Sequence, residues 1–260
     1  MIMPSWDPDL YERYKAYRDR PALDLMVQIP DRRYREIWDL GCGAGEHAAL
    51  LALRHPMANV HGLDSSPDML RQAKNRQSDV TWVLSGIEDF APAVAPDLIF
   101  TNAALQWLPD HEALLPRLVG QLAPGGVFAC QMPMAFETEH HRILRDTAEQ
   151  GAWAALTRGA RRINPTPPLD AYYDWLSALC GEVDLWTTTY LHALEGDDPV
   201  VDWMRGTALR PYLDALAGDD ALLEAFLGAF RARIAEAFPP RADGVTLFPF
   251  PRLFMVAVRR

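Results

Sequence analysis

The chain contains few cysteines and no long apolar run. Its 260 residues include only Cys42, Cys130 and Cys180, which are too few and too dispersed for a disulfide framework or a zinc site. No stretch approaches the roughly 18 consecutive apolar residues of a membrane-spanning helix, and residues 1–10 lack the charged and apolar segments of a signal peptide. We therefore expect a soluble, cytoplasmic protein.

Basic residues are outnumbered and scattered along the chain. Arg and Lys total 25 against 35 Asp and Glu, and the formal net charge is −10. Proteins that bind nucleic acids usually cluster their basic residues on one surface, so RNA and DNA are not expected partners. With 49% hydrophobic residues, the chain can bury one α/β core and still carry added helices.

A glycine-rich turn is the most informative feature of the sequence. Gly41, Gly43 and Gly45 follow a predicted strand and precede a predicted helix, and Asp64 ends the next strand, about 20 residues on, as in a nucleotide-binding βαβ unit. The glycines permit positive φ and leave the backbone bare, while Asp64 can accept hydrogen bonds from both hydroxyls of a ribose. The segment predicts a ligand that contains adenosine.

The residues around this turn favour a cationic ligand. The glycines are spaced G-x-G-x-G instead of the G-x-G-x-x-G of dinucleotide sites, and the carboxylates of Asp39 and Glu46 flank the place where a pyrophosphate would lie. S-adenosylmethionine carries a sulfonium and an ammonium group. The segment from Asp39 to Gly45 resembles the first motif of the class I S-adenosylmethionine-dependent methyltransferases. A glycine-rich turn without a ligand is the alternative interpretation.

Strand and helix signals alternate along the chain, which predicts a Rossmann-like α/β fold with a mostly parallel, seven-stranded sheet. We expect one methyltransferase domain over residues 1–260, with an N-terminal helical lid segment at 1–30 and helical cap insertions at 133–169 and 197–240. Ser65 or Ser66 is expected to cap the second helix. The predicted strands are 37–40, 60–63, 80–84, 96–100, 126–132, 183–190 and 247–258, and the first two predicted helices are 46–54 and 67–75.

Further motifs are distributed along nearly the whole chain. They include Arg18-Asp19-Arg20-Pro21-Ala22, Leu63 to Met69, Asn102 to His111, Gln131-Met132-Pro133, Leu209-Arg210-Pro211 and Phe250-Pro251-Arg252-Leu253-Phe254. Together these motifs resemble the trans-aconitate 2-methyltransferase family. The resemblance implies an enzyme that transfers a methyl group from S-adenosylmethionine to a carboxylate of trans-aconitate, giving the monomethyl ester and S-adenosylhomocysteine.

The resemblance also implies which residues contact the cofactor. One position departs from the family: relatives often carry an Asp that contacts the adenine amino group where this chain has Gly86, and Glu88 or Asp89 could substitute for it. The expected cofactor-binding residues are Asp39, Gly41, Gly43, Asp64, Ser65, Met69, Ile87, Asn102 and Ala103.

The expected reaction needs positioning and no catalytic acid or base. A carboxylate with a pKa of about 4 is already ionised near neutrality, and Arg side chains can bind the carboxylates of the substrate bidentately. The adjacent His140 and His141 point apart on a helix and predict no metal site. The candidate substrate-binding residues are Arg18, Arg20, Arg210 and Arg252, followed by His192, Tyr190, Gln106 and Trp107.

Two alternatives to this function stay open at the level of the sequence. The same fold and cofactor could serve another small carboxylate or a carrier-bound malonyl ester. The chain could also be a non-catalytic S-adenosylmethionine-binding module. The sequence does not indicate an oligomeric state.

Overall fold

The computed structural model describes residues 15–160 and 164–260, which form two compact units. The larger unit contains residues 20–133, 167–188 and 252–260, and the described part of the smaller unit contains residues 15–19, 134–160, 164–166 and 189–251. Three of the five boundaries between the units fall inside an element, namely in α2 (Lys15–Gln28), β6 (Cys180–Leu194) and β7 (Thr246–Arg259).

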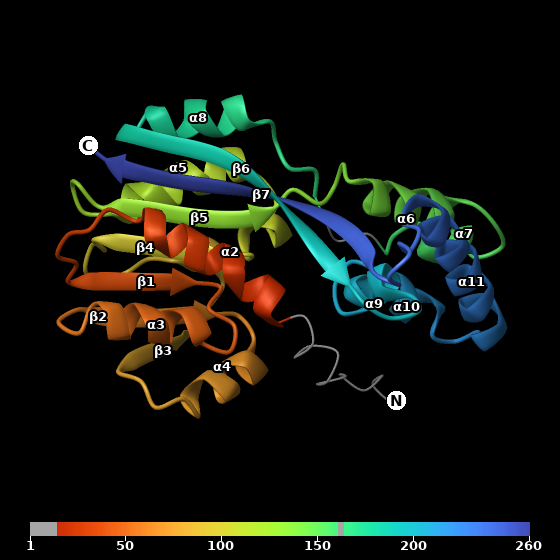
Figure 1. Cartoon of the computed structure of the whole chain (residues 1–260). Coiled ribbons are helices and arrows are strands. Elements are labelled where there is room, and N and C mark those ends of the chain that lie inside the picture. The colour runs from red at the N-terminus through yellow and green to blue at the C-terminus, as the bar shows by residue number, and fades with distance from the viewer. Residues whose placement is uncertain (1–14, 161–163) are drawn as a thin grey trace. The chain divides into compact units, whose positions relative to one another are not determined.

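A seven-stranded sheet forms the framework of the larger unit (Figure 1). Its strand order is β3-β2-β1-β4-β5-β7-β6, the first five strands are parallel, and β7 is antiparallel to β5. This confirms the predicted fold class. The five parallel strands are β1 (Glu36–Leu40), β2 (Asn59–Asp64), β3 (Val80–Leu84), β4 (Leu98–Asn102) and β5 (Val127–Pro133).

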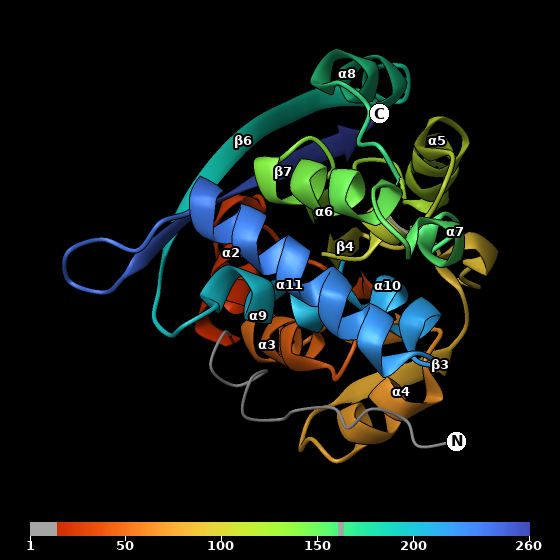
Figure 2. The same ribbon diagram turned by 90° about the vertical axis from the view of Figure 1, so that its right-hand side faces the viewer.

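Helices cover both faces of this sheet (Figures 1 and 2). On one face lie α2, α3 (Glu46–Arg54) and α4 (Pro67–Lys74); on the other lie α5 (His111–Gln121) and α8 (Leu169–Ser177). Two short 3₁₀ helices, η1 (Ile87–Asp89) and η2 (Leu105–Trp107), follow β3 and β4. Both faces of the central strands are buried, which is why β4 and β5 are almost continuously apolar in sequence.

Local sequence signals explain two of the element boundaries. Ser66 caps α4, because its hydroxyl accepts the Met69 N–H at 3.3 Å and Pro67 occupies the first helical position. The fourth strand begins at Leu98, two residues later than predicted. Asp97 is instead part of a turn, where its carboxylate accepts the backbone N–H groups of Arg35 and Glu36 at 2.7 and 3.1 Å.

Two buried side chains connect α5, α8 and η2. The His111 Nε2 lies 2.9 Å from the Leu105 carbonyl oxygen, which can only accept, so this nitrogen carries the proton. The His111 Nδ1 then accepts the Tyr172 hydroxyl at 2.6 Å. Both side chains are buried, and the pair fixes η2, which follows β4, against the helices of this face.

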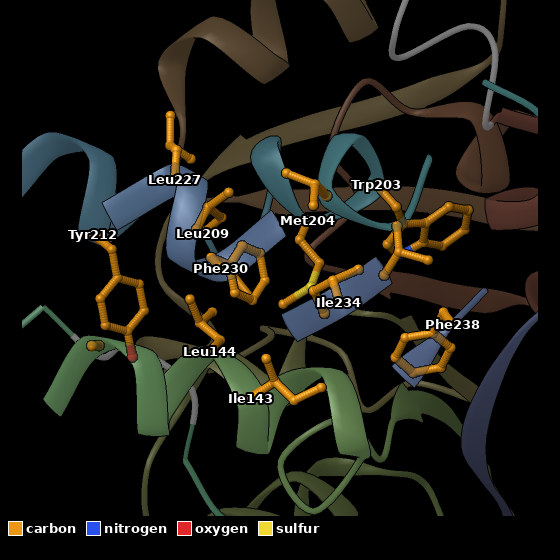
Figure 3. Close-up of a cluster of buried hydrophobic side chains, with 14 of the residues drawn as sticks. Ile143, Leu144, Trp203, Met204, Leu209, Tyr212, Leu227, Phe230, Ile234 and Phe238 are labelled. Atoms are coloured by element: carbon orange, nitrogen blue, oxygen red, sulfur yellow. The ribbon is translucent and has the colours of Figure 1, made fainter. Parts of the chain in front are cut away.

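The smaller unit has its own apolar core (Figure 3). Its helices are α6 (Glu139–Glu149), α7 (Ala154–Thr157), α9 (Pro199–Arg205), α10 (Arg210–Leu216) and α11 (Asp220–Ala237). Asp219 caps α11 by accepting the Leu222 N–H at 3.0 Å. The labelled core residues are Ile143, Leu144, Trp203, Met204, Leu209, Tyr212, Leu227, Phe230, Ile234 and Phe238.

The helices of the smaller unit fall largely within the segments expected as cap insertions, 133–169 and 197–240. The expected lid segment 1–30 is described only from residue 15, and residues 20–28 of α2 belong to the larger unit. There the Met26 carbonyl oxygen accepts a hydrogen bond from Arg54 of α3 at 2.5 Å. Among the described residues, no helix combines the length and apolarity needed to span a membrane.

Candidate active site

The glycine-rich turn follows β1 and closes onto β2. The N–H groups of Gly41 and Cys42 both donate to the Leu63 carbonyl oxygen, at 2.8 and 3.0 Å. Gly41 has a φ of +74°, and a Cβ on it would lie 2.4 Å from the Ala104 Cβ. Gly43 has a φ of +55°, and no atom of the described residues lies within 4 Å of its Cβ position. The turn therefore favours glycine at both positions because of the positive φ, and at Gly41 also because a Cβ would overlap the Ala104 side chain.

Asp64 lies at the end of β2 and is bonded to this turn. One carboxylate oxygen accepts the Gly43 N–H at 2.9 Å, and the other accepts the Ser66 N–H at 2.8 Å. Each oxygen of an ionised carboxylate has a second lone pair. Asp64 can therefore hold the turn and still accept one further hydrogen bond on each oxygen, as two ribose hydroxyls would require.

Asp39 is a buried carboxylate with an unused oxygen. The residue is 1% exposed, and its Oδ2 has no hydrogen-bond partner in the described structure. Burial, and then the negative charges of Asp64 and Glu46, raise the pKa of Asp39 to about 8, against a lowering by the Ala48 backbone N–H. Glu46 is itself paired with Arg76. Because a buried anion is costly without a counter-ion, this position favours a cationic ligand group.

Two amide side chains, one at the end of β4 and one after it, each have an oxygen without a hydrogen-bond partner in the described structure. Ala103 has a φ of +53°, and its N–H donates to the Gln131 carbonyl oxygen at 2.8 Å. The Gln106 Nε2 donates to the Ala103 carbonyl oxygen at 2.6 Å. The Asn102 Oδ1 and the Gln106 Oε1 are buried without a hydrogen-bond partner in the described structure. Both oxygens can accept hydrogen bonds from a ligand.

Strand register places five polar residues on one face of the sheet, at the carboxyl ends of its parallel strands. Residues in register on neighbouring strands share a face, as do residues two apart on one strand. Asn102 is the register partner of Gln131. The register of β1, β2 and β7 places Asp39, Asp64 and Arg252 on the same face. This set, called the polar row below, consists in strand order of Asp64, Asp39, Asn102, Gln131 and Arg252.

Gln131 is absent from the residues selected on the sequence. It is fully buried, and neither its Oε1 nor its Nε2 has a hydrogen-bond partner in the described structure. A signal for it exists in the sequence: it is the polar residue in the apolar strand Val127–Pro133. The resemblance drew attention to its motif but assigned it no role.

The predicted substrate-binding residues of the larger unit differ in their environments. Arg252 is 5% exposed and belongs to the polar row. The Arg20 side chain is 70% exposed and lies 3.8 Å from Asp24, one helical turn away. Trp107, in η2, is 44% exposed. Arg18 lies in the part of α2 that belongs to the smaller unit, and its side chain is outside the described part of the chain.

The remaining predicted substrate residues belong to the smaller unit. Tyr190 and His192 are buried on β6. The His192 ring stacks on Trp203 with centroids 4.9 Å apart and lies 4.7 Å from the Tyr17 ring. Arg210, at the start of α10, pairs with Asp214 at 2.9 Å in a half-exposed ion pair. The structure thus groups Tyr190 and His192 in an aromatic cluster and places Arg210 in a helical ion pair.

The predicted adenine-side residues lie in the larger unit after β2 and β3. Ile87, in η1, is buried, Met69 is half-buried in α4, and Ser65 is exposed. The Glu88 carboxylate folds back over Gly86, with its oxygens 2.8 and 2.9 Å from the position that a Cβ on Gly86 would take. The carboxylate of Glu88 therefore occupies the space where an acidic side chain at position 86 would begin.

His140 and His141 are both buried in α6. Burial lowers the pKa of both, that of His141 to about 4, so the pair is neutral at physiological pH. The His140 ring stacks on Phe250 with centroids 5.8 Å apart. Among the described residues, no group of three or more His, Cys, Asp or Glu side chains could hold a metal ion.

Two solved structures illustrate the similarity in fold. The YcgJ protein of Bacillus subtilis is 16% identical, with a TM-score of 0.59 over 92% of this chain and 98% of that chain. Phosphoethanolamine N-methyltransferase 2 of Haemonchus contortus, solved in complex with S-adenosyl-L-methionine, is 16% identical, with a TM-score of 0.56 over 92% of this chain and 52% of that chain.

Sequence comparison gives a closer relationship. Residues 38–130 match the model of a family described as a methyltransferase domain. Over its full length the chain is similar to trans-aconitate 2-methyltransferase of Azoarcus sp. (strain BH72), 48% identical over 99% of this chain and all of the relative. The protein of the same name from Methylobacterium radiotolerans is 45% identical over 98% of each chain. The chain therefore belongs to the trans-aconitate 2-methyltransferase family and has the fold of the class I S-adenosylmethionine-dependent methyltransferases.

Proposed function

We propose that this protein transfers the methyl group of S-adenosylmethionine to a carboxylate of trans-aconitate, forming the monomethyl ester and S-adenosylhomocysteine. The observation that carries the proposal is that the similarity to enzymes of that name covers 99% of the chain, and so both compact units. The similarity to relatives named for this substrate therefore extends over the smaller unit as well as the sheet.

The residues at the carboxyl edge of the sheet fit the cofactor. Asp64 has a free lone pair on each oxygen for the ribose hydroxyls. Asp39 supplies negative charge to the cationic end in its ionised form, which a bound cation favours over the protonated form of the free protein. The Asn102 Oδ1, which has no partner in the described structure, supplies an acceptor for the ammonium group. When bound, S-adenosylmethionine supplies a methyl group on a positively charged sulfur. Its proposed contacts are Asp39, Gly41, Gly43, Asp64, Ser65, Met69, Ile87, Asn102 and Ala103.

The proposed reaction uses the protein to position its reactants. A carboxylate with a pKa of about 4 is ionised at neutral pH and attacks without a general base. Holding the attacking oxygen in line with the bond from sulfur to methyl can contribute on the order of 7 kcal/mol. No residue of this chain then needs to give or take a proton during the transfer.

We propose Arg252 as the principal cation for the acid, with Arg18, Arg20 and Arg210 as further candidates. A nearly buried guanidinium binds a carboxylate in a poorly screened environment, whereas an exposed one is screened by water. Arg252 is 5% exposed, while the side chains of Arg20 and Arg210 are exposed or half-exposed. Gln106, Trp107, Tyr190 and His192 are proposed to complete substrate recognition.

We further infer that the protein acts in the cytoplasm on a free small acid and not on nucleic acid. Cys42, Cys130 and Cys180 are all buried free thiols, as suits a reducing compartment. The net charge of −10 would repel a polyanion.

The test is an acceptor screen that measures the release of S-adenosylhomocysteine, with the product identified by mass spectrometry. The acids to compare are trans-aconitate, cis-aconitate, citrate and a carrier-bound malonyl group. We expect trans-aconitate to have the highest kcat/KM, because fixed cations recognise the directions of three carboxylates and these directions change with the geometry of the double bond. A higher kcat/KM for another of these acids would identify that acid as the substrate in place of trans-aconitate. Binding of the cofactor without any transfer would indicate a non-catalytic module.

A further inference from the structure

Gln131 combines complete burial with a carboxamide that bonds to nothing else in the described structure. Its exposed fraction is 0%, and both its Oε1 and its Nε2 lack hydrogen-bond partners. Burying an amide without hydrogen bonds destabilises a fold, and most buried polar groups are paired. A fully unpaired carboxamide in a central strand therefore indicates a group that meets its partner only when a ligand is present.

The surroundings of Gln131 are built from neighbouring strands on the same face of the sheet. Asn102 is its register partner on β4, and the Asn102 Oδ1 has no hydrogen-bond partner among the described residues. Its partner on β7 is Phe254, on which Trp186 stacks with ring centroids 4.9 Å apart. Arg252 lies two residues from Phe254 on the same face. Gln131 thus stands between an unpaired amide oxygen, an aromatic wall and a nearly buried cation.

The strand order sets the distance between Gln131 and Asp64, the proposed ribose-binding residue. Neighbouring strands lie about 4.8 Å apart, so Gln131 on β5 is roughly 14 Å across the sheet from Asp64 on β2, with β1 and β4 between them. In S-adenosylmethionine the sulfur is bonded directly to C5′ of the ribose. If Asp64 holds that ribose, the methyl group lies near β1 and β4, and β5 is the next strand beyond it.

We propose that Gln131 binds the acceptor acid, with its Nε2 donating to the non-attacking oxygen of the carboxylate that is methylated, while Arg252 pairs with another carboxylate of the same molecule. This inference rests on the proposed function and adds to it a residue that fixes which oxygen attacks. Gln131 is a binding residue with direct contact to the substrate.

The chemistry of the transfer explains why an amide suits this position better than an arginine. In the reaction a bond forms between a carboxylate oxygen and the methyl carbon as the bond from sulfur to methyl breaks, and its electron pair stays on sulfur, which becomes a neutral thioether. No proton moves. A guanidinium holds both carboxylate oxygens through charge-assisted bonds, which would withdraw charge from the nucleophile. A neutral amide can hold one oxygen and leave the other free to attack.

Two substitutions separate a binding role from a structural role. Gln131→Met keeps an unbranched side chain of similar length and removes both polar atoms. Gln131→Glu keeps the shape but replaces the donor with an anion that repels a carboxylate. Gln77→Glu, at an exposed position after α4, adds the same charge change away from the site and serves as the control. The measurements are the melting temperature, the Kd of S-adenosylhomocysteine by calorimetry, and kcat and KM for trans-aconitate.

We expect Gln131→Met to melt at or above the temperature of the parent, because it removes an unpaired polar group from the core. Its kcat/KM for trans-aconitate should fall about 10- to 100-fold, the size of one lost hydrogen bond to a charged group. The kcat/KM of Gln131→Glu should fall further. Both variants should keep the parental Kd for S-adenosylhomocysteine, and Gln77→Glu should match the parent throughout.

Several results would overturn the inference. A lowered melting temperature of Gln131→Met together with an unchanged KM would make Gln131 a structural residue that bonds to internal water. A changed Kd for S-adenosylhomocysteine with unchanged acceptor kinetics would move it to the cofactor site. If the parent methylates trans-aconitate and the variants do so equally well, the inference fails alone. If the parent neither methylates nor binds trans-aconitate, the proposed function fails and the inference with it.

Discussion

The carboxylate of Asp64 lies 2.9 Å from the backbone nitrogen of Gly43, and this bond ties the end of β2 to the glycine-rich turn after β1. Asp64→Ala should therefore lose both the proposed ribose contact and the support of the turn. We expect binding of S-adenosylhomocysteine to weaken by roughly 2 to 3 kcal/mol, the scale of hydrogen bonds to a charged group. Calorimetric titration measures this change in affinity. Asp64→Asn, which keeps one acceptor, should lose less, and an unchanged affinity in folded Asp64→Ala would remove the ribose role.

The buried carboxyl of Asp39 makes stability depend on pH. Its pKa rises from 3.8 to about 8 on folding, chiefly through burial, so the folded state binds the proton more tightly than the unfolded state. The stabilisation from this proton is complete below about pH 4 and is lost as the pH rises through about 8. Asp39→Asn should therefore gain in melting temperature over the parent by more at pH 8 than at pH 5. An equal difference at the two pH values would contradict this environment for Asp39.

The ionisation of Asp39 should change the affinity for the methyl donor but not the rate of methyl transfer. Ionised Asp39 attracts the cationic donor, so the affinity for S-adenosylmethionine should rise between about pH 6 and 8, whereas that for the uncharged thioether of S-adenosylhomocysteine should change less. With saturating donor, kcat should be flat over this range, because an ionised carboxylate needs no base. Steady-state kinetics and calorimetry across the range separate the two. A steep rise in kcat near neutrality would favour a hydroxyl or amine acceptor.

Burial distinguishes the proposed substrate arginines. Arg252→Met should reduce kcat/KM for the acid by on the order of 3 kcal/mol in transition-state stabilisation, because it leaves a carboxylate unpaired beside the polar row. Arg210→Met should cost less, since the Arg210 side chain is half-exposed and its charge is screened by water. Arg71→Met is the matched control, because Arg71 is 70% exposed and pairs with Asp68. Equal activities of the Arg252 and Arg71 variants would exclude Arg252 from substrate binding.

The hydrogen bond between Tyr172 and His111 should contribute to stability. Tyr172→Phe removes the hydroxyl and leaves the buried His111 Nδ1 without its donor, which should lower the free energy of unfolding by about 1 to 3 kcal/mol. Urea denaturation gives this value. Tyr173→Phe, at an exposed neighbouring position, should have no measurable effect. A Tyr172→Phe protein as stable as the parent would mean that water replaces the hydroxyl.

Much of the larger unit could be predicted from local pattern. The glycine-rich turn, Asp64 and the apolar strands follow short-range rules of backbone freedom and burial, and the third strand matches the prediction residue for residue. The predicted start of β4 was wrong because the Asp97 carboxylate accepts hydrogen bonds from the backbone of Arg35 and Glu36. This contact spans about 60 residues of chain, and no local signal reveals it.

The substrate side was harder to predict because its residues depend on long-range surroundings. Arg20, Arg210 and Arg252 look alike in sequence, yet only Arg252 is nearly buried, since it lies in a strand within the sheet. Gln131 stands out only when its burial and its missing partners are known. The last strand was predicted to within one residue at each end, whereas β6 begins three residues earlier and ends four residues later than the predicted segment 183–190.

The buried cysteines give the chain a practical property. Cys42, Cys130 and Cys180 are at most 5% exposed, and burial raises the pKa of each thiol, so thiol reagents should react with them slowly in the native state. The natural sequence is thus a ready background for selective labelling. One cysteine introduced at an exposed position of each unit, such as Gln77 and Glu224, would carry a fluorophore pair whose transfer efficiency reports the separation of the units as donor, product and acid are added.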